Sequence, residues 1–147
     1  MRKLLLITAA ALLAGSTSGL QAKSKAMKWM EGPPGLPAGS TFTVVSGDPG
    51  KKGMFTIRAR LPADYAVPAH WHPTNERVTV LSGKLHYGMS DKLDMAKAKT
   101  LAAGHSVTMT AKMNHWVHAP VATTIQVSGR GPFQITYVDP KDDPRKK

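Results

Sequence analysis

Residues 70–83 read HWHPTNERVTVLSG, and this stretch decides between the folds that the rest of the chain allows. In an extended segment, residues two apart project to the same side, so His70 and His72 can share one ion. Pro73 then turns the chain, and Glu76 enters the next strand on the face that also carries its valines. This parity predicts a carboxylate at the edge of an apolar interior, beside two imidazoles.

A fourth candidate ligand, His115, stands at the start of another strand, behind a glycine turn at Ala103 and Gly104. Three neutral nitrogens and one carboxylate oxygen suit Mn, Fe, Ni, Co or Zn, whereas Ca and Mg prefer all-oxygen sets. If such an ion is six-coordinate, two positions stay open for a small molecule. The sequence therefore predicts one divalent transition-metal ion, and its four candidate ligands are His70, His72, Glu76 and His115.

Around these residues the chain reads as many short strands separated by turns of Gly, Pro, Asp and Ser. The predicted strands are 41–46, 53–61, 77–81, 84–89, 106–109, 115–118, 123–128 and 133–138. The only helical candidate is 91–99, which has a single weak turn of apolar spacing. So many short strands with hardly any helix indicate an all-β fold, either an antiparallel sandwich or a double-sheet jelly roll. The strand pattern alone leaves both open.

The spacing of His70, His72, Glu76 and Gly83 resembles the first motif of the cupin superfamily. Gly104, followed eleven residues later by His115, is similar to the second motif. The resemblance implies an antiparallel double-stranded β-helix, or jelly-roll barrel, with a metal ion bound between its sheets by the four candidate ligands. It also implies a homodimer formed through a sheet edge or an N-terminal arm.

The second motif departs from the usual pattern at several positions. Thr110 and Lys112 stand where a Pro-x-Gly turn is usual, and Ala119 replaces a frequent asparagine. At the head of the first motif, Asp64 occupies a position where glycine is common. The resemblance is greatest to small exported cupins of a single domain.

The two ends of the chain differ from the strand-rich part. Residues 1–22 have a positive start, an eleven-residue apolar run and small residues near Ala22, a pattern typical of a cleaved signal peptide. We therefore expect a periplasmic or secreted protein with no stable membrane anchor after cleavage. Residues 23–40 are rich in proline and glycine and predict an N-terminal arm, residues 41–138 form the barrel domain, and residues 139–147 predict a flexible tail.

The composition limits the classes of partner that we expect. The formal charge is +11, or +9 without Arg2 and Lys3, which suggests attraction to small anionic molecules, cell-surface polymers or membrane faces, or simply a solvated basic surface. Basic residues are scattered, without the basic stripe or stacking aromatics that nucleic-acid recognition needs, so we expect no nucleic-acid partner. Cysteine is absent, which excludes disulfides and thiolate ligands.

The other histidines, the tryptophans and the large apolar residues are not expected to bind the ion. His118, three residues after His115, should lie on the opposite face of its strand, and His86 and His105 should be exposed. Trp71 and Trp116 each follow a ligand and should point away from the ion. The remaining large apolar residues considered are expected in the core: Tyr87, Phe133, Tyr137, Met89 and Met109.

Three functions remain open at this stage. A metal-dependent enzyme of oxidoreductase or dioxygenase type would act on a small molecule at the open metal positions. A non-catalytic binding module would capture a small ligand or metal complex there, and a structural ion would only tie the two sheets together. No general base is evident beyond the ligands, because Asp64, Asp91 and Asp94 all fall in turns, so catalytic residues are not assigned.

Overall fold

Eleven strands make up about half of residues 26–147, the part of the chain that the computed structural model describes. The signal-peptide prediction for residues 1–22 lies outside these residues. The strands are β1 (Met30–Glu31), β2 (Thr41–Ser46), β3 (Gly53–Leu61), β4 (Tyr65–Trp71), β5 (Glu76–Ser82), β6 (Lys84–Gly88), β7 (Lys99–Ala102), β8 (Ser106–Met109), β9 (His115–Ala119), β10 (Thr123–Gly131) and β11 (Thr136–Tyr137). Three 3-10 turns, η1 (Met95–Lys97), η2 (Pro140–Asp142) and η3 (Pro144–Lys146), complete the elements. No helix within the described range is long and apolar enough to cross a membrane.

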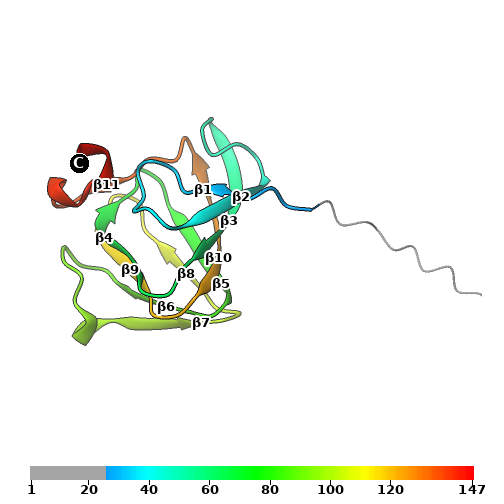
Figure 1. Cartoon of the computed structure of the whole chain (residues 1–147). Helices are drawn as coiled ribbons and strands as arrows, with labels where there is room; N and C mark the ends of the chain where they lie inside the picture. The colour runs from blue at the N-terminus through cyan, green and yellow to red at the C-terminus, as the bar shows by residue number, and fades with distance from the viewer. Residues whose placement is uncertain (1–25) are drawn as a thin grey trace, which may run out of the picture.

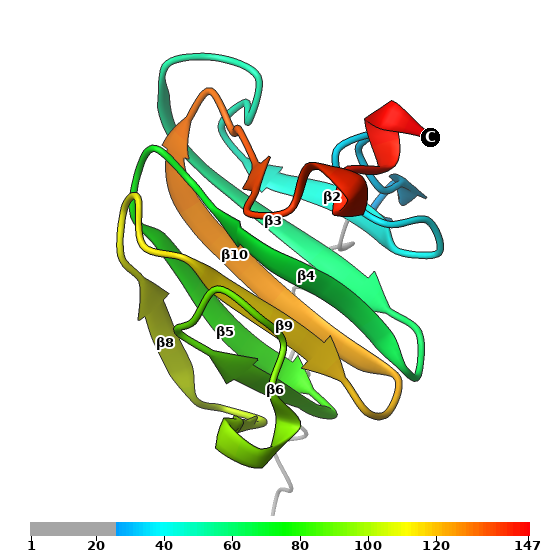
Figure 2. The ribbon, with the colours of Figure 1, turned by 90° about the vertical axis from the view of Figure 1, so that its left-hand side faces the viewer.

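The strands form two antiparallel sheets that face each other (Figures 1 and 2). One sheet has the order β1-β2-β3-β10-β5-β8, and the other has the order β11-β4-β9-β6-β7. Strand β10 lies between β3 and β5, so segments far apart in the sequence are neighbours in the sheet. This arrangement confirms the all-β prediction and resolves it in favour of the jelly-roll barrel.

Alternation along the strands places one face of each sheet in the core. In β3, Phe55 and Ala59 are buried, whereas Arg60 on the other face is exposed. In β5, Val78 and Val80 are buried and follow Glu76 at steps of two, as the sequence predicts. Because the inner faces of both sheets are apolar, the polar residues that do face inward are candidates for function.

The structure contains a strand that the pattern did not predict. Strand β4 contains Tyr65, Val67 and Trp71, but Pro68 and two alanines are poor strand formers and weaken its strand signal. It is held by pairing with β9, with a register shift between Val67 and His70 that accommodates the proline. The helix expected over 91–99 is wrong, since only the single turn η1 forms there.

Three turn residues in the two cupin-like motifs have left-handed backbone conformations. Gly83 has a φ of 80°, and a Cβ there would lie 2.6 Å from the Ala122 carbonyl oxygen, so the turn between β5 and β6 requires glycine. Asp64 and Lys112, which replace common glycines, have φ values of 62° and 61°. Both non-glycine residues thus adopt the left-handed conformation that glycine favours, and the turns persist.

Both ends of the described chain pack on the barrel. The Tyr65 hydroxyl donates to the Pro37 carbonyl at 2.6 Å, and the Tyr137 hydroxyl donates to the Gly35 carbonyl at 2.9 Å, which ties the arm down. At the other end, expected as a flexible tail, η2 and η3 form, and Arg145 donates to the Ile135 carbonyl at 3.1 Å. This anchoring uses a side chain to backbone bond that the charged composition of the tail does not reveal.

Candidate metal centre

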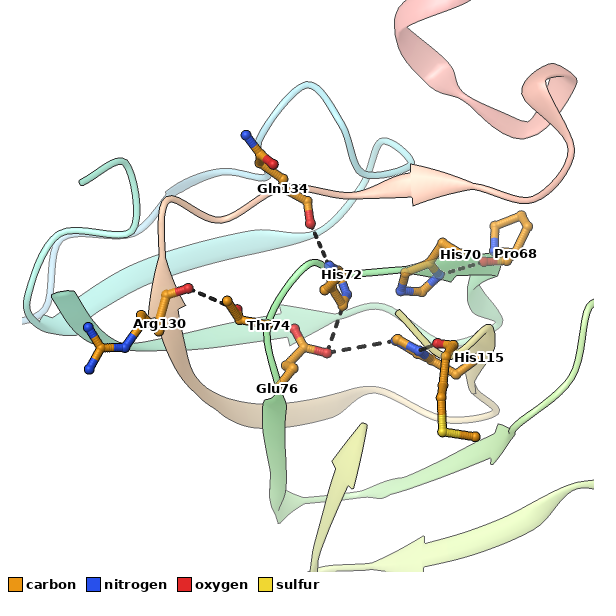
Figure 3. Close-up of polar contacts among 9 residues, drawn as sticks. Pro68, His70, His72, Thr74, Glu76, His115, Arg130 and Gln134 are labelled. Carbon is orange, nitrogen blue, oxygen red and sulfur yellow. Dashed lines mark hydrogen bonds and ion pairs between the residues drawn. The ribbon is translucent and has the colours of Figure 1, made fainter. Parts of the chain in front are cut away.

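The four candidate ligands come from three strands that meet at one end of the barrel interior (Figure 3). His70 lies in β4, and His72 follows the end of that strand. Glu76 is the first residue of β5, and His115 is the first residue of β9. His70 and His115 are direct partners in the β4–β9 ladder, so the sheet register itself brings their rings together.

The three histidines form a compact buried cluster. One ring nitrogen from each can be chosen so that all lie within 4.8 Å of one another, and the residues are only 4%, 5% and 1% exposed for His70, His72 and His115. Glu76 lies beside this cluster, with Oε2 3.5 Å from His72 Nε2 and 3.9 Å from His115 Nε2. The structure therefore brings all four predicted residues together, with the histidines as the tighter group.

Backbone carbonyls fix the tautomer and orientation of each imidazole. Nδ1 of His70 donates to the Pro68 carbonyl at 2.6 Å, and Nδ1 of His72 donates to the Gln134 carbonyl at 2.7 Å. Nδ1 of His115 donates to the Met113 carbonyl at 3.0 Å. With Nδ1 carrying the proton, each Nε2 keeps a free lone pair, which is the arrangement that metal-ligating histidines use.

The polar groups of the cluster fit a cation. His115 Nε2 is buried without a hydrogen-bond partner, and a buried polar atom in that state is costly unless something binds it. Nitrogen lone pairs together with a carboxylate match a borderline transition metal and do not match calcium or magnesium. The residues present therefore suit a divalent transition-metal ion.

Burial shifts the protonation of these side chains in the direction that metal binding requires. Desolvation lowers the pKa of His70 well below its ordinary value, and it also lowers the pKa of His72 and of His115. The imidazoles are thus neutral and able to ligate at neutral pH. Desolvation also raises the pKa of Glu76 from 4.5 to about 7, while the neighbouring His115 opposes this rise. A bound cation would favour the ionised carboxylate.

A cavity of about 260 Å³ extends from the cluster into the barrel. Its walls come from both sheets and from the N-terminal arm, through Pro33 and Leu36. Among its lining residues there is no lysine, arginine or aspartate. The anionic ligand suggested by the net charge thus has no cationic side chain to meet it inside this cavity.

Residues outside the predicted set also shape the site. The Phe133 ring lies 5.0 Å from the His72 ring between centroids and lines the cavity. The carbonyls of Pro68, Met113 and Gln134 orient the histidines. Sequence reasoning missed these carbonyls because any residue type supplies one, and it took Phe133 as core alone.

The other histidines lie away from the cluster. His118 faces the opposite side of β9 and stacks on His86, with ring centroids 6.1 Å apart, and His105 sits exposed in a turn. Neither Trp71 nor Trp116 lines the cavity. Tyr137 and Met109 are buried as predicted, and Tyr87 and Phe133 are partly buried, but Met89 is 37% exposed, so its core prediction is wrong. Met89 follows the last residue of β6, where the inward alternation ends.

A two-sheet antiparallel jelly roll with a histidine cluster between its sheets defines a cupin, the RmlC-like double-stranded β-helix fold. The model of the family described as "Domain of unknown function (DUF4437)" matches residues 19–136, and the chain belongs to that family. No curated protein matches the sequence.

Solved structures share this fold at low sequence identity. A candidate acetylacetone dioxygenase from Methylibium petroleiphilum PM1 has a TM-score of 0.62 at 20% identity, over 95% of this chain and 90% of the other. An RmlC-like cupin from Shewanella frigidimarina has a TM-score of 0.57 at 13% identity, over 71% and 83% of the two chains. The polyketide cyclase RemF from Streptomyces resistomycificus has a TM-score of 0.59 at 14% identity, over 73% and 76%. These likenesses establish the fold.

Proposed function

We propose that the protein is a metal-dependent enzyme, of oxidoreductase or dioxygenase type, that acts on a small molecule held in the barrel. The observation that carries this proposal is the cluster of three buried neutral imidazoles whose Nε2 atoms converge beside Glu76 at one end of the cavity. Glu76 is proposed as the fourth ligand. When bound, the ion would supply Lewis-acid or redox chemistry to a molecule at its open positions.

The chain's own residues have defined tasks in this proposal. His70, His72 and His115 bind the ion, and the carbonyls that accept from their Nδ1 atoms keep them oriented. The apolar walls exclude water, which strengthens electrostatic interactions inside the cavity. In the metal-free chain burial raises the pKa of Glu76 to about 7, and a bound cation would favour the ionised carboxylate that serves as the ligand.

A second function, a non-catalytic binding module, is favoured by one observation. Apart from the metal-end residues, the cavity lining offers only the Tyr65 and Ser40 hydroxyls as polar side chains, so no further acid or base stands ready. Turnover would then depend on the ion and Glu76 alone. Oxygen consumption with a panel that includes acetylacetone, the compound in one neighbour's name, separates the two functions. Ligand-dependent thermal shifts without turnover would indicate the binding module.

Metal content tests the site itself. We expect about one transition-metal ion per chain after dialysis, and loss of that ion in His72→Ala, because an imidazole ligand is removed. His105→Ala is the matched control, since His105 is exposed and outside the cluster. If His72→Ala retains its metal by elemental analysis, the proposed site is wrong.

Export is also part of the proposal, supported by the signal-like pattern of residues 1–22. We expect the mature protein in the periplasm or medium, with its N-terminus near residue 23. Cell fractionation and N-terminal sequencing of the mature chain test this. A full-length protein confined to the cytoplasm would refute it.

A further inference from the structure

Residues from both ends of strand β4 line the same cavity, and the sheet registers separate these two ends. In the β4–β9 ladder, His70 pairs with His115 at one end and Tyr65 pairs with Ala119 at the other. Five residues of a strand separate His70 from Tyr65, or about 16 Å. We call the cluster of His70, His72, Glu76 and His115 the metal end, and the group of Ser40, Leu61, Tyr65 and Leu85 the far end; both line the same cavity.

The walls between the two ends are apolar. They come from the inner faces of both sheets, so no backbone hydrogen-bonding group is spared for a ligand. The residues that form them are Ile57, Ala59, Val67, Val78, Val117, Ile125 and Val127. Phe42 also lines this part of the cavity, so a molecule that reaches past the metal end touches apolar side chains.

The polar atoms of the far end are already engaged. The Tyr65 hydroxyl donates to the Pro37 carbonyl at 2.6 Å and lies 3.1 Å from the Ser40 hydroxyl oxygen. A ligand that carried a charge to the far end would lose its hydration without gaining a partner, which is strongly unfavourable. The far end thus discriminates against any molecule with a second charged group.

We infer that the cavity selects small molecules with one oxygen-bearing head group and an apolar body, and that it rejects compact molecules charged at both ends. This inference rests on the proposed function, because the head group is expected at the metal end. The volume of about 260 Å³ holds roughly nine groups the size of a water molecule or methylene. The body is therefore a short chain or a single ring.

A series of linear monocarboxylates tests the inference on the zinc-loaded protein, because zinc is redox-inert and allows binding without turnover. By calorimetry we expect affinity to rise about fourfold per methylene from butyrate toward octanoate, as each methylene enters the apolar walls. Longer chains should then bind no better, because they exceed the cavity volume of about 260 Å³. Affinity that does not change with chain length would overturn the inference.

A pair of acids matched in carbon number and different in charge sharpens the test. Hexanoate and adipate have the same number of carbons, but adipate would place its second carboxylate among the aliphatic walls. We expect adipate to bind at least 100-fold more weakly than hexanoate. Equal binding of the two acids would refute the selection for an apolar body.

Two substitutions along β3 should change the chain length of the best-bound carboxylate, which we call the length limit, in opposite directions. Ala59→Leu fills the middle of the cavity and should shorten the best-bound acid by two or more carbons, whereas Leu61→Ala opens the far end and should lengthen it. Thr124→Leu, on the outer face opposite Arg60, is the matched control and should leave the limit unchanged. If Ala59→Leu fails to fold, Leu61→Ala alone still decides, because an unchanged limit in that variant contradicts the inference.

The failure of this inference can be told apart from failure of the proposed function. Metal content is measured on every sample, so a protein that holds zinc but shows no length dependence refutes the inference alone. A protein that holds no metal refutes the proposed function, and the cavity is then judged with neutral probes on the metal-free chain. There we expect 1-hexanol to bind and hexane-1,6-diol to bind at least tenfold more weakly, and equal binding would refute an apolar cavity.

Discussion

Replacing Glu76 with glutamine should stabilise the metal-free protein and weaken the metal-loaded one. Burial raises the pKa of this carboxyl from 4.5 to about 7 in the folded chain, while in the unfolded chain it titrates at its ordinary value. The folded state therefore loses stability as the pH rises from 4.5 to 7, and the full penalty remains above that range. A pKa difference of this size corresponds to about 3 kcal/mol. The side chain is only 14% exposed, so solvent relieves little of it.

Glutamine preserves the shape of the side chain and cannot ionise, so Glu76→Gln removes the penalty. We expect metal-free Glu76→Gln to be more stable than the parent by about 2–3 kcal/mol at pH 8. The difference should shrink toward zero as the pH falls to 4.5, where the parent carboxyl is protonated in both states. Urea unfolding with a chelator present, followed by tryptophan fluorescence, measures this, because Trp116 is fully buried.

The metal-loaded protein should show the opposite sign. A cation beside Glu76 turns the costly carboxylate into a ligand, so its replacement should weaken metal affinity by roughly tenfold or more. Glu31→Gln, at the exposed strand β1, is the control and should change stability by less than ~0.5 kcal/mol at any pH. A variant that is less stable than the parent at pH 8 without metal, or that binds metal equally well, would refute the reasoning.

Further predictions concern the turns and the ion. Gly83→Ala should destabilise the fold by about 2 kcal/mol or more, because its φ of 80° is left-handed and its Cβ would meet the Ala122 carbonyl; equilibrium unfolding checks this. Lys112→Gly should stabilise the fold by about 1 kcal/mol, because glycine adopts the left-handed conformation at this position more readily than lysine. Lys99→Gly in strand β7 is the control and should destabilise the fold. Similar effects of the two substitutions would contradict this prediction. Zinc at 100 times its dissociation constant should raise the free energy of unfolding by about 2.7 kcal/mol, and His115→Ala should abolish this gain in thermal unfolding.

The strands that the sequence predicted best are those in which alternation is regular. The ranges 41–46, 53–61 and 106–109 coincide with β2, β3 and β8, and alternation is clearest in β3, where Phe55, Ile57, Ala59 and Leu61 share one face. In strand β4 the buried Tyr65, Val67 and Ala69 also alternate, but Pro68 and two alanines weaken the strand signal. Its conformation follows from pairing with β9, which a single segment does not encode.

Some features of the candidate site likewise follow from local sequence, whereas others depend on how the strands pair. The parity of His70, His72 and Glu76 is a local property, so the sequence predicted that their side chains face one interior. The approach of His115 depends on the β4–β9 register, which no local stretch of sequence encodes. The carbonyls that orient the rings have no sequence signature at all, because every residue carries one.

Charge balance connects the metal end with the apolar cavity behind it. In the proposed site, three neutral imidazoles and one ionised glutamate around a divalent ion would leave a net charge of one positive unit in a region of low dielectric. A ligand with a single anionic oxygen would neutralise that charge, whereas a dianion would carry its second charge toward walls that offer no cation. The same burial that keeps the histidines neutral thus sets the charge of the molecule that the site accepts. Glu76 is the residue on which this balance depends, because its protonation alone changes the net charge of the site by one unit.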